Sequence, residues 1–92
     1  MAKKFPAALK KFGAKIQELR IDAGITQKEL SEKCELEVRT IQRIENGEHA
    51  VNLNNIIAIA LSFDMNPYEL LLHIDVSSKG KIIRIKHVIK RT

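Results

Sequence analysis

The sequence predicts an all-α domain built from five helices. Apolar residues recur three or four positions apart, which places them on one face of a helix. Helix-capping residues and glycines separate these stretches from one another. Ninety-two residues are enough for one domain. We place that domain at residues 1–76 and expect a short basic tail at residues 77–92.

The first helix is predicted from Pro6 to Ala23, followed by Gly24. Proline suits a first helical turn because its missing N–H would be unpaired there. An inward apolar stripe with alternating spacings of four and three residues is formed by Phe5, Leu9, Phe12, Ile16 and Leu19.

Residues 26–47 predict two short helices joined by a tight turn. Thr26 and Glu29 have the spacing of a capping box, which marks the start of the first helix. The apolar register breaks at residues 34–36 and resumes through Ile41 and Ile44. Gly47 then ends the second helix, because glycine readily adopts a positive φ. This is a helix-turn-helix arrangement, in which the second helix enters the DNA major groove.

Two further helices are predicted after this unit. Asn52 caps a fourth helix that runs from Leu53 to Phe63, and Asn66 precedes a fifth that starts at Pro67. Together these two helices carry more apolar surface than a domain of this size can bury. We therefore expect a homodimer through this half of the chain. The predicted interface residues are Ile59, Leu72 and Ile74. A generous core with scattered exposed apolar side chains is the alternative.

Positive charge is concentrated at the two ends of the chain. Residues 1–15 contain five lysines, residues 77–92 contain six basic residues, and neither segment contains an acidic residue. Residues 16–76 contain five basic and eleven acidic residues. The ends therefore carry +11 and the middle carries −6, which together give the net charge of +5. We expect the ends to attract DNA phosphates, although they could also serve only solubility.

The conformation of the tail stays open. Residues 77–80 predict a hinge, and beyond it Ile83, Ile85 and Ile89 alternate with basic residues as in a strand. The set Ile82, Ile85 and Ile89 equally fits a helix. The β-branched residues favour an extended segment that pairs with a partner, and disorder until DNA binds is the alternative.

Two motifs in this chain resemble those of the phage repressor/Cro family, also called the XRE family. They are Thr26-Gln27-x-Glu29-Leu30 and Thr40-Ile41-x-Arg43-Ile44-Glu45-Asn46-Gly47. The resemblance runs from about residue 12 to residue 71 and implies a five-helix repressor/Cro-like fold that binds double-stranded DNA. It also implies a structural ion pair between Arg20 and Glu45.

The outward face of the second helix in the motif carries the predicted base-reading residues, which are Glu37, Val38, Arg39, Gln42 and Arg43. Arginine can bind guanine through two hydrogen bonds, a carboxylate can accept from cytosine, and valine suits the thymine methyl group. Glu37 occupies the N-cap position, where the family usually has Ser or Thr.

Positioning contacts complete the predicted DNA site. The resemblance assigns them to Gln27, Thr40 and Asn46. Gln27 would contact either a phosphate or the second helix of the motif, which is the recognition helix. The turn between the two helices lacks the usual glycine, so Cys34 or Glu35 must adopt an unusual backbone angle.

Other function classes find little support in the sequence. It contains no phosphate-binding glycine motif, no paired zinc ligands and no nucleophile with a matching base, so we expect no enzyme, metal site or cofactor. The single cysteine, Cys34, fits a small buried packing residue. No run of 18 apolar residues is present, so we expect no membrane contact and a cytoplasmic location.

The sequence therefore predicts a transcription regulator that binds a near-palindromic operator as a homodimer. A narrower version is an autoregulated controller, for example of a restriction-modification operon. One alternative is an antitoxin whose tail, residues 77–92, binds a partner protein. Another is a scaffold that keeps the fold without binding DNA.

Overall fold

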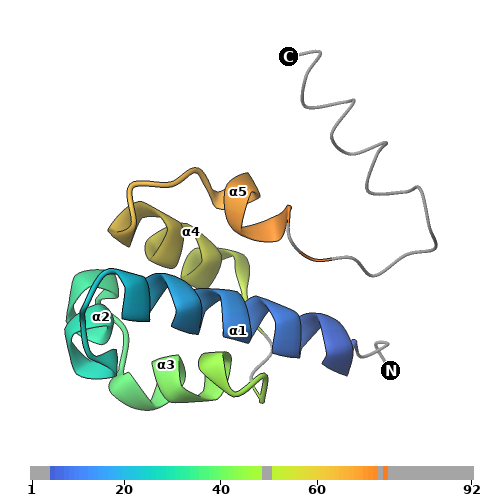
Figure 1. Cartoon of the computed structure of the whole chain (residues 1–92), viewed down its shortest axis with the longest axis horizontal. Helices are drawn as coiled ribbons and strands as arrows, with labels where there is room; N and C mark the ends of the chain where they lie inside the picture. The colour runs from blue at the N-terminus through green and yellow to red at the C-terminus, as the bar shows by residue number, and fades with distance from the viewer. Residues whose placement is uncertain (1–4, 49–50, 73, 75–92) are drawn as a thin grey trace.

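A computed structural model of the chain describes residues 5–48, 51–72 and 74, and this part of the chain is all-helical, as predicted. The helices are α1 (Pro6–Asp22), α2 (Gln27–Cys34), α3 (Val38–Glu45), α4 (Leu53–Ser62) and α5 (Pro67–Leu71). In Figure 1, α1 crosses the molecule with α3 on one side and α4 and α5 on the other. The predicted tail at residues 77–92 lies outside the described residues.

The capping box of α2 is formed as predicted. The Thr26 hydroxyl accepts a hydrogen bond from the Glu29 N–H at 3.0 Å, and the Glu29 carboxylate accepts one from the Thr26 N–H at 2.8 Å. The second of these bonds lowers the pKa of the Glu29 carboxyl. Glu29 therefore keeps its negative charge beside the positive end of the helix dipole. By contrast, the Glu37 side chain makes no capping bond to α3.

The turn between α2 and α3 depends on a left-handed residue. Glu35 adopts φ 56°, so it is Glu35 rather than Cys34 that takes the unusual angle. A residue with a side chain pays about 1–2 kcal/mol for this conformation. Gly47, at φ 73°, adopts the same region after α3 without that cost. Asp64 also has a positive φ, which the sequence pattern did not indicate.

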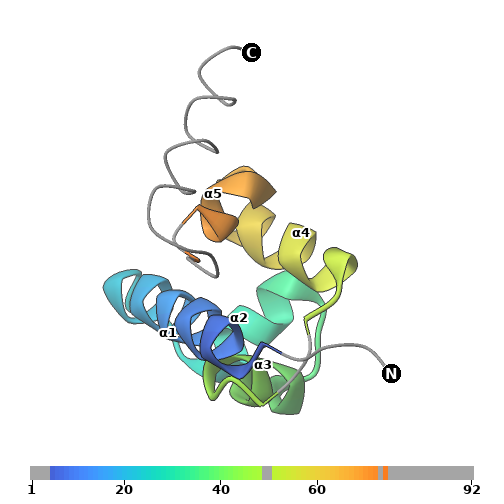
Figure 2. The same ribbon diagram turned by 90° about the vertical axis from the view of Figure 1, so that its right-hand side faces the viewer.

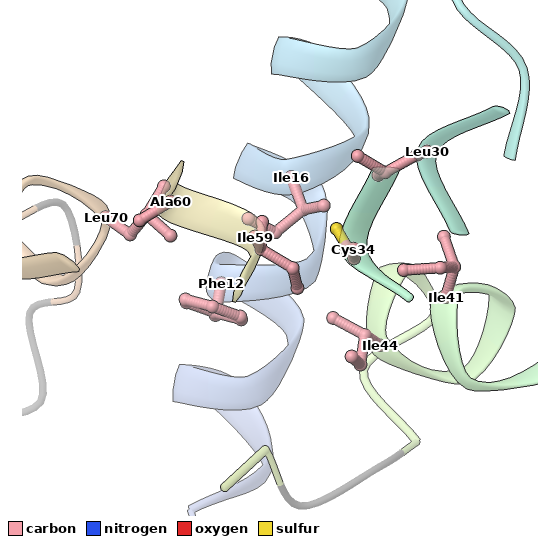
Figure 3. Packing of buried hydrophobic residues seen from close by; sticks show 9 residues of the cluster. All are labelled: Phe12, Ile16, Leu30, Cys34, Ile41, Ile44, Ile59, Ala60 and Leu70. Atoms are coloured by element: carbon pink, nitrogen blue, oxygen red, sulfur yellow. The ribbon is translucent and has the colours of Figure 1, made fainter. Parts of the chain in front are cut away.

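All five helices contribute to one hydrophobic core (Figure 3). Its buried members are Phe12, Ile16, Leu30, Cys34, Ile41, Ile44, Ile59, Ala60 and Leu70. Burial raises the pKa of the Cys34 thiol, which stays a neutral packing group as predicted. In the predicted stripe of α1, Leu9 is only half-buried and lies outside this cluster, and Phe5 is exposed. Phe5 precedes the helix and is 53% exposed, so it does not belong to the core.

The prediction that Ile59 lies in a dimer interface is wrong. Its side chain is 0% exposed and packs in the core, where no second copy can contact it. Because α4 is apolar on nearly every side, its sequence does not reveal which side turns inward. The exposed apolar side is a stripe of three residues spaced by four, Leu53, Ile57 and Leu61.

Gly13 allows α1 and α3 to approach each other closely. A Cβ added to Gly13 would lie 2.1 Å from the backbone oxygen of Ile44 and 2.7 Å from that of Glu45. No residue with a side chain fits there unless the helices move apart. The only feature of the sequence that points to this close approach is a glycine inside a helical stretch, where glycine is otherwise unfavourable.

Replacing Gly13 with alanine should therefore destabilise the fold. Helix propensity alone predicts that alanine raises the free energy of unfolding by about 1 kcal/mol, so a lower value would have the opposite sign. We expect a loss of about 3 kcal/mol or more, because the clash is with backbone atoms that cannot rotate away. Chemical denaturation measures the free energy of unfolding.

Gly24→Ala is the matched control for this experiment. A Cβ at Gly24 meets nothing within 4 Å, so the variant pays only for its positive φ. That cost is about 1–2 kcal/mol. A Gly13→Ala protein that is as stable as the wild type would show that α1 and α3 are not held at this distance.

Candidate nucleic-acid interface

The outward face of α3 exposes the side chains that the sequence assigned to base reading. Val38, Arg39, Gln42 and Arg43 are exposed on this helix, and Glu37 is exposed immediately before it. The apolar residues of α3, Ile41 and Ile44, face the core instead. The structure thus brings the five predicted residues together on one surface, and their contact with DNA stays a prediction.

The two arginines on this face are available to a ligand. Arg39 and Arg43 are four residues apart, which makes them neighbours on the helix surface. Among the residues that the structure describes, neither has an ion-pair partner. Thr40 is half-buried beside them, and Asn46 is exposed at the C-terminal end of the helix.

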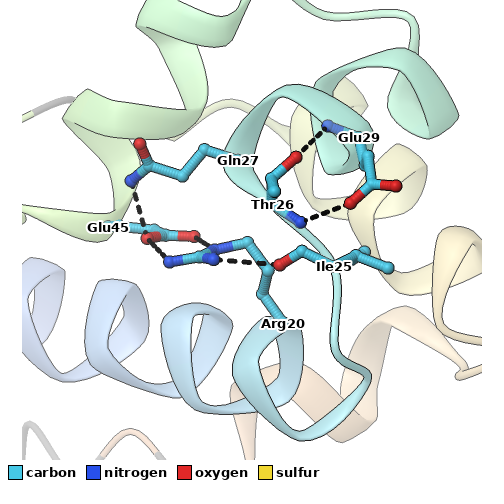
Figure 4. A network of polar contacts seen from close by, with 6 residues as sticks. All are labelled: Arg20, Ile25, Thr26, Gln27, Glu29 and Glu45. Carbon is cyan, nitrogen blue, oxygen red and sulfur yellow. Dashed lines mark hydrogen bonds and ion pairs between the residues drawn. The ribbon is translucent and has the colours of Figure 1, made fainter.

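Arg20 and Glu45 form the ion pair that the family resemblance implied (Figure 4). Arg20 Nε lies 2.7 Å from Glu45 Oε2, and Arg20 Nη2 lies 3.1 Å from Glu45 Oε1. The Glu45 side chain is only 1% exposed. The hydrogen bond with Glu45 raises the pKa of Arg20. A buried carboxylate is costly unless it is paired in this way.

Two further hydrogen bonds tie this pair to α2 and to the loop that precedes it. Gln27 Nε2 donates to Glu45 Oε1 at 3.0 Å, and Arg20 Nη1 donates to the backbone oxygen of Ile25 at 3.0 Å. Glu45 is the last residue of α3, Arg20 is in α1, and Gln27 opens α2. The network therefore fixes the end of α3 to both other helices. Of the two roles predicted for Gln27, the structure shows the contact with the recognition helix.

A helix-turn-helix family model matches residues 16–70, which is more than half of the chain. The match contains the capping box, the Arg20–Glu45 pair and the whole of α3. The chain belongs to this family. Its type is the XRE or Cro/C1 type, and its members are DNA-binding transcription regulators. The chain is therefore a regulator of this class, with α2 and α3 as its helix-turn-helix.

Solved structures show the same fold. The restriction-modification controller protein C.AhdI from Aeromonas hydrophila is 36% identical, with a TM-score of 0.67 over 70% of this chain and 97% of that chain. ComR from Streptococcus suis is 32% identical, with a TM-score of 0.64 over 85% of this chain but only 25% of ComR. A sequence comparison with curated proteins gives no match.

A third similar structure is the clp gene regulator ClgR from Corynebacterium glutamicum. It is 17% identical, with a TM-score of 0.67 over 91% of this chain and 87% of that chain. At this identity the likeness concerns the fold alone. The fold is thus shared by chains with little sequence identity.

Membrane-spanning helices and metal-binding clusters are absent from the described ranges. No helix there is long and apolar enough to cross a membrane. The same residues contain no group of three or more His, Cys, Asp or Glu side chains that could hold a metal ion.

Removing Arg20 should destabilise the fold through Glu45. Arg20→Ala leaves a buried carboxylate with one partner fewer, which we expect to cost about 3 kcal/mol. Combining it with Glu45→Gln should recover part of this loss, because the remaining side chain is neutral. Thermal and chemical denaturation of the wild type, both single variants and the double variant form a double-mutant cycle. A coupling energy near zero would mean that the two side chains do not interact in solution.

Proposed function

We propose that the chain binds a near-palindromic DNA operator as a homodimer and reads each half-site with the outward face of α3. The observation that carries this proposal is the pair of exposed arginines, Arg39 and Arg43, which lack ion-pair partners within the described part of the chain. Residues 16–76 are otherwise acidic, so generic attraction to phosphate is weak there. Arginines in that setting are better placed to read bases than to supply charge.

Each side chain on this face has a base that suits it. Arg39 and Arg43 would bind guanine O6 and N7, and Val38 would contact a thymine methyl group. Glu37 does not cap α3, which leaves its carboxylate able to accept from cytosine N4. Gln42 would reach an adenine or a nearby phosphate.

Positioning is assigned to residues at the edges of the same surface. Thr40 and Asn46 would contact the DNA backbone beside α3, and the basic ends of the chain would add sequence-independent attraction. Gln27 already donates to Glu45, so its role includes holding α3 in place.

The dimer would form through the apolar stripe of α4, residues Leu53, Ile57 and Leu61. Leu53 and Leu61 are 67% and 63% exposed. Figure 1 shows α4 and α5 on the opposite side of α1 from α3, so a partner bound there leaves the reading face free. Leu72 and Ile74 are partly exposed and stay candidates for the edge of this interface.

Control of its own operon is the biological role that we favour. C.AhdI is described as a restriction-modification controller, and nearly its whole length matches this chain at 36% identity. This supports the narrower proposal of an autoregulated controller. The antitoxin alternative depends on the tail, residues 77–92, which lies outside the described residues.

The proposed dimer can be tested by light scattering at micromolar concentration. The wild type should have twice the monomer mass of 10.5 kDa. Leu61→Glu should shift it toward the monomer, because a charge would enter the apolar interface. Ile21→Glu is the control, since Ile21 is 60% exposed on α1. A wild type that stays monomeric even with DNA would contradict the proposal, as would equal dissociation by Ile21→Glu.

The assignment of Arg39 to base reading can be tested by selection from a randomised duplex library at fixed salt. Arg39→Ala should lose about 1–3 kcal/mol at the selected site and relax the preference at one base pair in each half-site. The relaxed positions should be symmetric, with half-site centres about 34 Å apart. Lys33→Ala, at the end of α2, should leave the preference intact. If Arg39→Ala selects the same sequence and is merely weaker, Arg39 contacts a phosphate instead.

A further inference from the structure

Lys10 lies over the turn that ends the recognition helix. A Cβ added to Gly47 would lie 2.7 Å from Lys10 Cγ and 2.9 Å from Lys10 Cα. Gly47 follows directly after the C-cap of α3. The backbone and stem of Lys10 therefore pack against the C-terminal end of α3, although the two residues are 37 positions apart in the sequence.

The close approach at Gly13 extends this contact. Gly13 is three residues after Lys10, so both lie on the same side of α1. Gly13 meets the backbone of Ile44 and Glu45. Figures 1 and 2 agree that the first half of α1 runs beside the end of α3. The position of Lys10 relative to the reading face is thus fixed by two backbone contacts.

The ammonium group of Lys10 has no partner inside the described part of the chain. Lys10 is exposed and forms no ion pair or hydrogen bond there. Lys11 is also exposed but lies on another side of α1, where it shares a surface with Ala14, Lys15 and Glu18. Two neighbouring lysines on one helix therefore face different surroundings.

The dimensions of DNA would allow Lys10 to reach the backbone of the duplex. Gly47 follows Arg39 by eight residues, which is roughly 12 Å along a helix. The major groove is about 12 Å wide, and a recognition helix contacts bases with its N-terminal residues. If α3 is inclined to the groove, so that only its N-terminal residues contact bases, its far end reaches the wall of the groove, which is lined by phosphates.

We propose that Lys10 binds a DNA phosphate at the wall of the groove next to the C-terminal end of α3. This inference rests on the proposed function, and it adds α1 to the DNA-contacting surface. A lysine suits the contact because its ammonium acts as a compact charge that carries no sequence information. The competing explanation is that Lys10 only offsets the negative end of the α3 dipole.

The test compares full-length Lys10→Gln, Lys10→Arg and Lys11→Gln proteins with the wild type. The DNA is a duplex selected by the wild type from a random library, and affinity is measured between 50 and 200 mM salt. Lys10→Gln should reduce the slope of log affinity against log salt by about 0.9 per bound protomer. It should leave the selected sequence unchanged. Lys10→Arg should keep the wild-type slope, and Lys11→Gln should lower the slope clearly less than Lys10→Gln does, because Lys11 lies on another side of α1.

A positional readout makes the assignment sharper. Single phosphates of the duplex are replaced one at a time by neutral methylphosphonates. At one position in each half-site, the replacement should weaken the wild type but not Lys10→Gln. The absence of such a position would overturn the proposal.

The remaining outcomes are separable. An unchanged slope for Lys10→Gln, or an equal loss for Lys11→Gln, overturns the role of Lys10 alone. An unchanged slope with a lowered melting temperature in the absence of DNA would assign Lys10 to the helix dipole. If the wild type selects no sequence, the proposed function fails and this inference fails with it.

Discussion

The buried carboxylate of Glu45 is the interaction on which the DNA-binding half of the molecule depends. It stands at the end of α3 and accepts hydrogen bonds from Arg20 in α1 and Gln27 in α2. Moving this charge out of water is unfavourable, and only the fixed arrangement of both partners offsets that cost. The pair thus works as a geometric constraint, because the three helices must adopt one relative position to satisfy it.

A second constraint acts at the same place. Gly13 lets the backbone of α1 touch that of α3 at Ile44 and Glu45, and Gly47 accommodates Lys10. Close backbone approach and a buried ion pair together leave α3 little freedom to tilt. A helix held in this way can present Arg39 and Arg43 at a defined angle, which hydrogen bonding to base edges requires.

The features that the sequence could predict are those encoded locally. The capping box at Thr26 and Glu29, the periodic apolar residues and the positive φ at Gly47 each depend on a few neighbouring residues. The Arg20–Glu45 pair was accessible only through family resemblance. Contacts between distant elements were not accessible. Ile59 was misassigned because α4 is apolar on nearly all sides, and nothing local to Gly13 or Lys10 indicates what lies across from them.

We propose that α3, fixed at its end through Glu45, is the element that meets DNA. Amide chemical-shift mapping by NMR tests it directly, with the full chain titrated against the duplex that it selects. The largest changes should fall on Val38 to Arg43 and on the first turn of α2, while the apolar stripe of α4 changes little. Changes concentrated on α4 and α5, with α3 unaffected, would contradict the account.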